Sequence, residues 1–509
     1  MSGALWRADG ARIVDPHGAD RVLRGVGLGN WLLPEGYMWL FGHDAQSPRE
    51  IEAAFARLAG EEYARSFWVE FRERFVTERD VRRIAASGFD HVRLPINARM
   101  VQAEDGSPLE DGLALIDRLI AQCERAGLGV LLDLHGAPGG QTGTNIDDSP
   151  RGRPDLFLEP GYRELTLELW RTLARRYRGR SAVIGYDLLN EPLPHHWQHR
   201  FENELRDLYV DLTAAVRAED PDHLLMYEGS HWATNWNLFT EVWDANSVLQ
   251  FHKYWSPPDR ASIATYLEAR DRLGLPIYMG EGGENTPEWL YAVTRLYEAE
   301  GIGWNLWPWK KLATHTSPAS IVPPPGWGRL AEAVGGRIEI DEAEARDTLD
   351  AYLEAIDIDA CEWRQDVVDA VFARAPRVLP AWGYGHRGSR ESFAPGPAEA
   401  TARPAGLESM RREDAVAIRF AGRGAENVFE YPGPGDHLHG RMVVDLAPGQ
   451  WLEFELDGAN RAAATWRALD ARGRDLGLAV ETVDRGLRVS ASGDREVSGL
   501  WRVVREERS

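Results

Sequence analysis

The sequence predicts an α/β protein: a TIM (β/α)8 barrel followed by a smaller all-β sandwich domain. Two observations predict the barrel. Eight short apolar segments can be traced from Val22 to Trp307, and amphipathic helical segments separate most of them. A third observation predicts the sandwich, because short β-type segments alternate with Gly- and Pro-rich turns after residue 408. We expect a barrel domain over 1–376, a linker over 377–407 and a sandwich over 408–509.

The N-terminal part adds two features to a plain barrel. Residues 5–20 predict a short β-hairpin, which we place as a plug under the barrel. Residues 47–87 follow the first strand and predict helices, because apolar side chains recur there at helical spacing. Thr77 and Asp80 resemble a capping box that starts the last of these helices, and Gly88 ends it.

The eight barrel strands are predicted from apolar runs that end in polar or turn residues. They are Val22–Gly29, Phe89–Ile96, Gly129–His135, Val183–Asn190, Leu224–Gly229, Ser247–His252, Pro276–Glu281 and Gly303–Trp307. Pro192 follows the fourth strand and cannot continue a ladder. Residues 231–246, between the fifth and sixth strands, are Trp-rich and leave little room for a helix.

The chain after the eighth strand predicts a long excursion over 312–340, and residues 341–375 predict one or two helices that close the barrel. Loops of that length are usually functional or flexible. Our hypothesis is that 47–87 and 312–340 wall off one end of a cleft, since both are long and flank strand ends.

The composition limits the classes of partner. The net charge of −22 argues against nucleic acid, anionic membranes and anionic polymers, so a neutral substrate fits best. The content of 20 Trp suits the flat apolar faces of sugars. Cys123 and Cys361 lie far apart and form no metal or redox motif, and a disulfide framework is not supported.

The beginning of the chain has no apolar run of signal-peptide length, and no stretch approaches the roughly 20 apolar residues of a membrane span. We therefore expect no membrane span, and either a cytoplasmic protein or a chain that lacks its leader. The sequence leaves the oligomeric state open.

Polar and aromatic side chains stand at the end of nearly every predicted strand. Because the carboxyl ends of barrel strands meet at one face, these side chains are expected to converge on one pocket. They are Asn30 and Trp31, Arg93 and Asn97, His135, Asn190 and Glu191, Glu228, His252 and Tyr254, Glu281, and Trp307.

Two glutamates stand out in this set, Glu191 after the fourth strand and Glu281 after the seventh. Cleavage of a glycosidic bond needs such a pair, one as an acid and the other as a nucleophile or base. Arg93 or the Tyr254 hydroxyl near a carboxylate would keep it ionised. Asn190 is placed to contact a sugar hydroxyl, and Trp307 offers a face for stacking.

Each residue also has a structural interpretation. Arg93 can pair with a barrel acid, His135 can be a core histidine, and Trp307 can be core packing. Glu284 competes with Glu281 as the second glutamate, but Glu281 directly follows the apolar strand.

Two further possibilities are weaker. Glu228 ends a strand too, and we expect it to support the site or bind substrate. A metal site from His135, His252 and Glu191 has no supporting ligand spacing, so we expect neither metal nor cofactor.

These residues resemble glycoside hydrolase family 5, the cellulase and exo-1,3-glucanase group. The ordered matches cover residues 5–375. They are Arg24-Gly-Val-Gly-Leu-Gly-Asn-Trp31, Gly88-Phe-Asp-His-Val-Arg-Leu-Pro95, Leu132-Asp-Leu-His-Gly-Ala-Pro-Gly-Gly-Gln141, Leu189-Asn-Glu-Pro192, His252-Lys-Tyr254, Gly280-Glu281 and Gly303-Trp-Asn-Leu-Trp-Pro-Trp309.

The resemblance implies Glu191 as acid/base and Glu281 as nucleophile of a retaining enzyme. It implies a substrate-binding shell, to which we add Trp31 and Glu284 as candidates. The shell is Arg93, His135, Asn190, His252, Tyr254 and Trp307.

The segment from Leu132 to Gln141 and the helices at 47–87 are most similar to the exo-1,3-glucanase branch. The chain departs from that branch after Glu281, where Gly-Gly-Glu-Asn replaces the expected Glu-Trp, and in the loop Thr142–Asp148. The sugar therefore stays open. We expect a neutral oligosaccharide, polysaccharide or glycoside as substrate, first of all a β-glucan or β-glucoside.

The alternatives are an arabinofuranosidase, a galactofuranosidase or a glycolipid glycosidase on the same scaffold. An inactive carbohydrate-binding protein is a distant alternative. The appended sandwich can bind carbohydrate or only brace the barrel.

Overall fold

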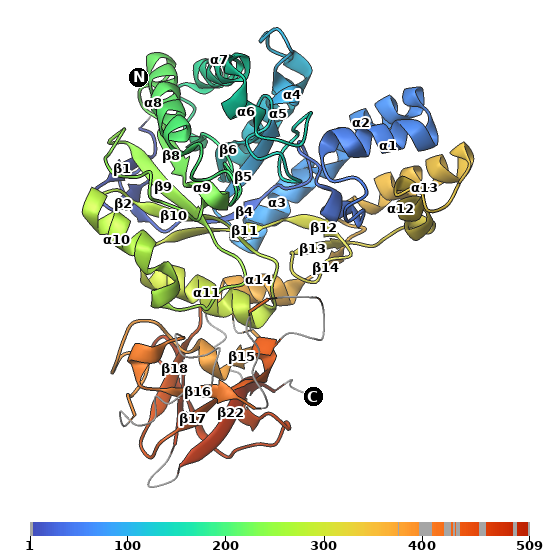
Figure 1. Cartoon of the computed structure of the whole chain (residues 1–509). Coiled ribbons are helices and arrows are strands. Elements are labelled where there is room, and N and C mark those ends of the chain that lie inside the picture. Colours follow the sequence, from blue (N-terminus) through green and yellow to red (C-terminus); the bar gives the residue numbers. More distant parts are fainter. Residues whose placement is uncertain are drawn as a thin grey trace. The chain divides into compact units, whose positions relative to one another are not determined.

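The computed structural model describes residues 4–374, 376–396, 410–421, 429–430, 433, 438–457, 465–491 and 496–506. A closed barrel of parallel strands, ordered β10-β11-β4-β5-β6-β7-β8-β9, forms its larger part and confirms the predicted fold class (Figure 1). The strands are β4 (Arg24–Gly27), β5 (His91–Asn97), β6 (Gly129–Gly136), β7 (Val183–Asp187), β8 (Leu224–Glu228), β9 (Ser247–His252), β10 (Ile277–Gly283) and β11 (Gly303–Trp307).

The predicted strand ends are correct to within a few residues, and β9 and β11 have the predicted bounds. The main difference is β7, which ends at Asp187 and not at Asn190. The chain leaves the sheet there, and Glu191 takes a left-handed backbone with φ 44°.

Helices join the strands as predicted. Helix α5, for example, buries an apolar stripe that includes Leu113, Ile116 and Ile120. The helices are α4 (Ala98–Val101), α5 (Glu110–Ala126), α6 (Asp155–Leu158), α7 (Pro160–Tyr177), α8 (Glu202–Glu219), α9 (Ser230–Ala233), α10 (Ala264–Leu273) and α11 (Pro287–Ala299). The connection from β8 to β9 holds only the four-residue α9, in line with its sequence.

The amino end of the barrel is closed by a small antiparallel sheet of β1 (Arg7–Asp9), β2 (Arg12–Val14) and β3 (Asp20–Arg21). Ile13 of β2 packs with Leu131, Leu224 and other barrel side chains in one buried apolar cluster. The predicted hairpin therefore has a third short strand and lies as the plug that we expected.

The helices α1 (Pro48–Ala59) and α2 (Glu61–Phe75) pack against α12 (Trp327–Val334) and α13 (Glu342–Ala355) (Figure 1). We call these four helices the helical lobe. Aromatic rings join its two halves: the ring centroids of Phe71 in α2 and Tyr352 in α13 are 6.4 Å apart. Parts of the separately predicted segments 47–87 and 312–340 thus form one lobe together with α13.

Two shorter elements border the lobe. Helix α3 (Glu78–Ser87) starts at the predicted capping box of Thr77 and Asp80. The strands β12 (Lys310–Leu312), β13 (Ala319–Ile321) and β14 (Glu362–Trp363) form a small sheet. The predicted excursion therefore contains regular structure.

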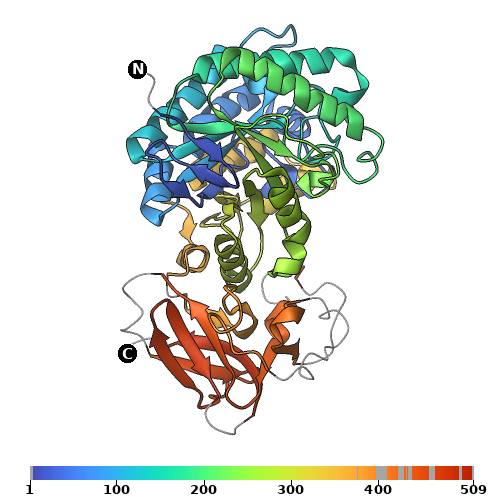
Figure 2. The ribbon, with the colours of Figure 1, turned by 90° about the vertical axis from the view of Figure 1, so that its left-hand side faces the viewer.

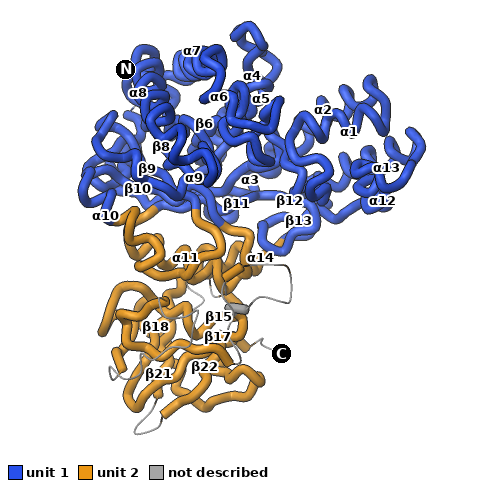
Figure 3. Tube along the Cα trace, in the orientation of Figure 1, with its two compact units in different colours: residues 1–252, 268–282, 303–363 blue, residues 253–267, 283–302, 364–509 orange. Residues whose placement is uncertain are grey.

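The chain forms two compact units (Figure 3), of which the second contains 253–267, 283–302 and 364–509. Its C-terminal strands form antiparallel sheets, coloured orange to red in Figure 2. They are β15 (Val378–Pro380), β16 (Ala417–Phe420), β17 (Met442–Leu446), β18 (Trp451–Glu455), β19 (Trp466–Asp470), β20 (Ala479–Val483), β21 (Gly486–Ser490) and β22 (Val497–Arg505). Helix α14 (Gln365–Val371) precedes them.

This sheet region confirms the all-β class of the C-terminal part, and β15 extends it into the predicted linker. Two of the short segments from which we predict this sandwich are 427–431 and 462–468. Residues 427, 428, 431 and 462–464 of these segments lie outside the described residues.

Within the second unit, the C-terminal chain holds loops that follow barrel strands. Asp259 Oδ2 accepts a hydrogen bond from the Arg411 backbone N–H at 2.8 Å, and Asn285 Nδ2 donates to the Phe429 carbonyl at 2.9 Å. Tyr291 Oη donates to the Glu455 carbonyl at 2.9 Å. The second unit therefore combines these segments after barrel strands with the C-terminal chain.

Candidate active site

Period-two alternation explains how polar side chains reach the barrel interior. In β6, Leu131, Asp133 and His135 are two residues apart and share one face, with the apolar Leu131 in the lower cluster. In β9, Gln250 and His252 follow Val248 in the same way. The interior thus changes from apolar at the amino end to polar at the carboxyl end.

Arg93 of β5 is the centre of this polar layer and is fully buried. Its guanidinium contacts four carboxylates. The distances are 2.9 Å from Nε to Asp187, 2.9 Å from Nη1 to Glu281, and 3.0 and 3.2 Å from Nη2 to Glu228 and Asp133. Such a planar fork fixes the directions of its partners.

Asn190 completes the surroundings of Arg93. Its Oδ1 accepts from Arg93 Nη2 at 2.8 Å, and its Nδ2 lies 3.3 Å from His135 Nε2. Gln141 Nε2 donates to the backbone carbonyls of His135 and Asn190, at 2.7 and 2.9 Å. The ends of β6 and β7 are held together in this way.

Side chains of two other strands, β8 and β9, hold Glu191 in place. Its backbone N–H donates to Glu228 Oε2 at 2.6 Å, and its Oε1 lies 2.7 Å from His252 Nδ1. His252 Nε2 lies 3.2 Å from Glu228 Oε1. Glu228 and His252 therefore hold both the backbone and the carboxylate of Glu191.

Glu281 reaches the site through an irregularity in β10. The register against β9 shifts between Met279 and Glu281, so Gly280 is the extra residue of a bulge. A Cβ at Gly280 would lie 2.1 Å from the Gln250 side chain, so no larger residue fits there. One carboxylate oxygen of Glu281, one of Glu191 and one ring nitrogen of His252 lie within 4.8 Å of one another.

Trp307 at the end of β11 stacks on His135, with ring centroids 5.5 Å apart and an angle of 8° between the planes. Its Nε1 donates to Tyr37 Oη at 2.9 Å. A Cβ at Gly27 or Gly29 would lie 2.5 or 2.6 Å from this ring. The glycine-rich first strand is thus required by the close approach of Trp307.

Burial and nearby charges shift the pKa values of the carboxyl groups. Burial raises the pKa of Asp133 to about 8, although Arg93 opposes the rise. Burial also raises the pKa of Glu281, with His252 opposing and the charge of Glu191 adding. The pKa of Glu228 is lowered although burial opposes this, because His252 and Arg93 lie beside it.

The pKa values of the two histidines of the site are shifted in opposite directions. Burial lowers the pKa of His135 to about 4, so its ring is neutral at neutral pH. Burial also disfavours the charged form of His252, but the charges of Glu228 and Glu281 raise its pKa well above the ordinary value. The His252 ring is therefore protonated at neutral pH, and its Nδ1 donates to Glu191 Oε1 at 2.7 Å.

Asp133 supplies a pH prediction for stability. Its pKa lies at about 8 in the folded protein and near 3.8 when unperturbed, so between these values the folded state binds more protons than the unfolded chain. This contribution makes the free energy of unfolding fall as pH rises from about 4 to 8.

The variant Asp133→Asn is expected to flatten that dependence, which urea unfolding at several pH values measures. An unchanged slope would contradict the assignment of the raised pKa to Asp133.

The sequence of the barrel matches a known family. Residues 54–312, just over half of the chain, match Cellulase (glycosyl hydrolase family 5). The chain belongs to glycosyl hydrolase family 5. It is therefore a glycoside hydrolase, and the resemblance found in the sequence motifs is confirmed.

Relatives are similar over parts of their length. A β-xylosidase of Phanerodontia chrysosporium is 28% identical over 350 residues, 61% of this chain and 71% of that protein. A probable glucan 1,3-β-glucosidase A of Aspergillus fumigatus is 32% identical over 238 residues, 46% of this chain and 56% of that protein. The chain thus spans just over half of the latter relative.

A solved structure of endogalactoceramidase has a similar fold. Its TM-score is 0.51 at 15% identity, with 99% of this chain and 100% of that chain covered.

Most of the predicted site residues of this family 5 protein meet in one buried network: Arg93, His135, Asn190, Glu191, His252, Glu281 and Trp307. Trp31 is not part of it, because the ring is 1% exposed and its Nε1 donates to the Arg72 carbonyl at 2.8 Å. Tyr254 and Glu284 belong to the second unit, where Trp255 Nε1 donates to the Glu284 carbonyl at 3.2 Å. The predicted binding roles of these three residues remain predictions.

Sequence reasoning missed Asp133, Asp187 and Gln250. All three lie inside apolar strands and are fully buried. A signal was present, because an acid flanked by leucines in a strand buried on both faces must be paired or protonated. Their partner, Arg93, could not be inferred from spacing.

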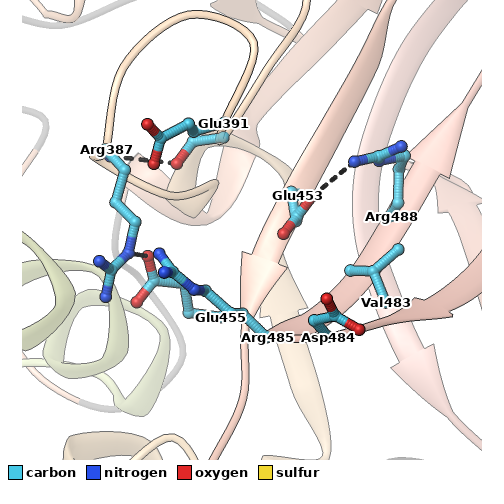
Figure 4. Close-up of a pocket in the computed structure, with 9 residues that line it drawn as sticks. Arg387, Glu391, Glu453, Glu455, Val483, Asp484, Arg485 and Arg488 are labelled. Carbon is cyan, nitrogen blue, oxygen red and sulfur yellow. Dashed lines mark hydrogen bonds and ion pairs between the residues drawn. The ribbon is translucent and has the colours of Figure 1, made fainter.

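A separate cavity of about 420 Å³ lies in the C-terminal part of the second unit (Figure 4). Its lining is Arg387, Glu391, Ser392, Glu453, Glu455, Val483, Asp484, Arg485 and Arg488. Ion pairs join Arg387 to Glu455 at 2.7 Å and Arg488 to Glu453 at 3.0 Å. The cavity lies outside the segment that matches family 5, and we assign it no catalytic role.

Proposed function

We propose that the protein hydrolyses β-glucosides with retention of anomeric configuration, with Glu281 as the nucleophile and Glu191 as the acid/base. The observation that supports this is the approach of the two carboxylates, whose oxygens come within 4.8 Å beside His252. Retaining glycosidases keep their two carboxyl groups roughly 5–5.5 Å apart, while inverting enzymes leave room for a water between them.

In the first step, Glu281 attacks the anomeric carbon and forms a glycosyl ester. Arg93 Nη1 donates a hydrogen bond to Oε2 of Glu281. We therefore assign the attack on the anomeric carbon to the other oxygen, Oε1. Glu191 gives its proton to the glycosidic oxygen, and the bond to the leaving group breaks. Glu191 regains a proton from water in the second step, and His252 Nδ1, 2.7 Å from Glu191 Oε1, holds its carboxyl group in place.

In the second step, water attacks the same carbon from the face that the leaving group has vacated. Glu191 removes a proton from this water, and Glu281 leaves as a carboxylate held by Arg93. Two inversions give net retention. Asn190, which Arg93 holds through Oδ1, is assigned to the hydroxyl next to the reacting carbon.

The choice of β-glucose rests on two observations. Relatives are named glucan 1,3-β-glucosidases, and the net negative charge of the protein favours a neutral substrate. The β-xylosidase relative makes β-xylose the second candidate, since xylose lacks only the hydroxymethyl group of glucose. A panel of nitrophenyl β-glucoside, β-xyloside, α-arabinofuranoside and β-galactofuranoside separates these sugars. We expect the highest kcat/KM on the β-glucoside, and a preference for a furanoside would overturn the sugar assignment.

The stereochemistry gives an independent test. Proton NMR of the first product is expected to show the β-anomer before mutarotation. The α-anomer as first product would replace the double displacement with an inverting reaction, and no turnover of any glycoside would favour an inactive binding protein.

A further inference from the structure

The cavity in the C-terminal part of the second unit lies over one face of the sheet of β18, β21 and β20 (Figure 4). Side chains two residues apart on a strand share a face, so Glu453 and Glu455 of β18 both belong to this face. Glu453 lies opposite Arg488 of β21, and Glu455 lies opposite Gly486. Gly486 pairs in turn with Val483 of β20. Because Gly486 carries no side chain, room is left between Glu455 and Val483, which both line the cavity.

The two glutamates of this face each keep one carboxylate oxygen available. Glu453 is 9% exposed, and its Oε2 accepts from Arg488 Nη2 at 3.0 Å. Glu455 Oε1 accepts from Arg387 Nε at 2.7 Å. Among the described residues, none donates a hydrogen bond to Glu453 Oε1 or to Glu455 Oε2. Since the two oxygens of a carboxylate accept about four hydrogen bonds, both glutamates have room for a further donor.

Two more charged side chains line the cavity without a partner in the described part of the chain. The Arg485 guanidinium and the Glu391 carboxylate are exposed, and neither makes a hydrogen bond or ion pair there. Arg387 and Arg488 are instead fixed by their glutamates, and Cζ of Arg488 also lies 4.2 Å from the centroid of the Trp451 ring. The lining therefore offers guanidinium donors and carboxylate acceptors side by side.

This mixture of groups selects the chemistry of a ligand. The lining has three arginines and four acidic residues, so a cation or an anion would meet like charges as well as opposite ones. A hydroxyl group donates and accepts, so it bonds to both kinds of side chain without carrying a charge. Val483 is the one aliphatic side chain of the lining, which leaves an apolar ligand little to pack against. The volume of about 420 Å³ is within the roughly 300–1,000 Å³ of small-molecule sites.

We propose that this cavity is a second, non-catalytic carbohydrate site, which holds a short stretch of a neutral glycan by hydrogen bonds to Glu453, Glu455 and Arg485. The site goes beyond the proposed function, because its residues take no part in the hydrolysis. Only the choice of sugar, a β-linked glucose oligosaccharide, rests on that function.

The test measures where such a sugar binds on the whole chain. The full-length Glu281→Gln variant lacks the proposed nucleophile, so the probe stays intact. It is mixed with a β-1,3-linked glucose trisaccharide at millimolar concentration, and amide hydrogen exchange is followed by mass spectrometry. Slower exchange is expected in residues 387–392 and 483–488, separately from any protection at the barrel site. The sugar concentration that gives half of this protection is the apparent Kd of the cavity.

Arg485→Ala, added to this variant, is expected to raise the Kd about tenfold, the effect of losing a hydrogen bond to a charged group. Glu391→Ala is expected to act in the same direction. Both side chains are exposed, so both variants are expected to keep the parent's thermal unfolding temperature. In the active protein, both are expected to leave kcat/KM on a nitrophenyl β-glucoside unchanged. The matched control is Arg472→Ala, an exposed arginine after β19 that lies outside the lining, and its Kd is expected to equal that of the parent.

Unchanged exchange of both segments in the presence of the trisaccharide would overturn the proposal. Equal Kd values in the Arg485→Ala and Arg472→Ala variants would overturn it too. Protection of both segments, combined with a parent protein that hydrolyses no glycoside, would instead support the cavity site and refute the proposed function.

Discussion

Replacement of Glu281 by alanine is expected to lower kcat on a nitrophenyl β-glucoside by at least about 10⁴-fold, as for other nucleophiles that form covalent intermediates. Without this carboxylate no glycosyl ester forms, and Glu191 alone can only protonate the leaving oxygen. Steady-state kinetics measures the loss. The alanine variant removes a partner of Arg93 and can therefore be destabilised. Glu281→Gln keeps the size of the side chain, so in that case it tests the loss of the charge alone.

Glu284→Ala is the matched comparison, because Glu284 lies three residues further along the chain. Its loss is expected to be less than about tenfold, the range of a modest substrate contact. If Glu281→Ala kept near-normal activity while Glu284→Ala lost it, the nucleophile would be Glu284.

Replacement of Glu191 by alanine is expected to give the second large effect, and the effect depends on the leaving group. A glycoside with an unactivated leaving group needs protonation, so its kcat/KM is expected to fall about 10²–10⁴-fold. The dinitrophenolate group of a dinitrophenyl glucoside leaves without a proton. The glycosyl ester therefore still forms in this variant, and it then accumulates.

Added azide is expected to accelerate that variant, because the anion attacks the ester without needing a base. The product should be β-glucosyl azide, formed as Glu281 leaves, and NMR identifies it. An azide product with the α configuration, or no acceleration at all, would contradict Glu191 as the acid/base.

The barrel could be predicted because its strands are apolar runs that end in polar or turn residues. Ser247–His252 and Gly303–Trp307 are buried throughout, and both have the bounds that the sequence predicts. The site could be predicted in outline for the same reason, since side chains at strand ends converge.

The rest depends on contacts that no local pattern encodes. The bulge at Gly280 that turns Glu281 inward follows from the Gln250 side chain of the next strand. The pairing of the helical lobe follows from rings such as Phe71 and Tyr352, which are more than 280 residues apart. Propensity also missed β15, whose three residues are a strand because β22 lies beside them.

The hydrogen bonds that hold the loops after β9 and β10 have a consequence for biosynthesis. Arg411 lies 152 residues after Asp259, and Phe429 lies 144 residues after Asn285. Glu455 lies 164 residues after Tyr291. A ribosome therefore releases Glu191 and Glu281 well before it makes these partners, and such non-local contacts form slowly. The second compact unit is completed only when the last hundred residues have emerged, so a stop codon in that stretch would leave its earlier segments without their partners.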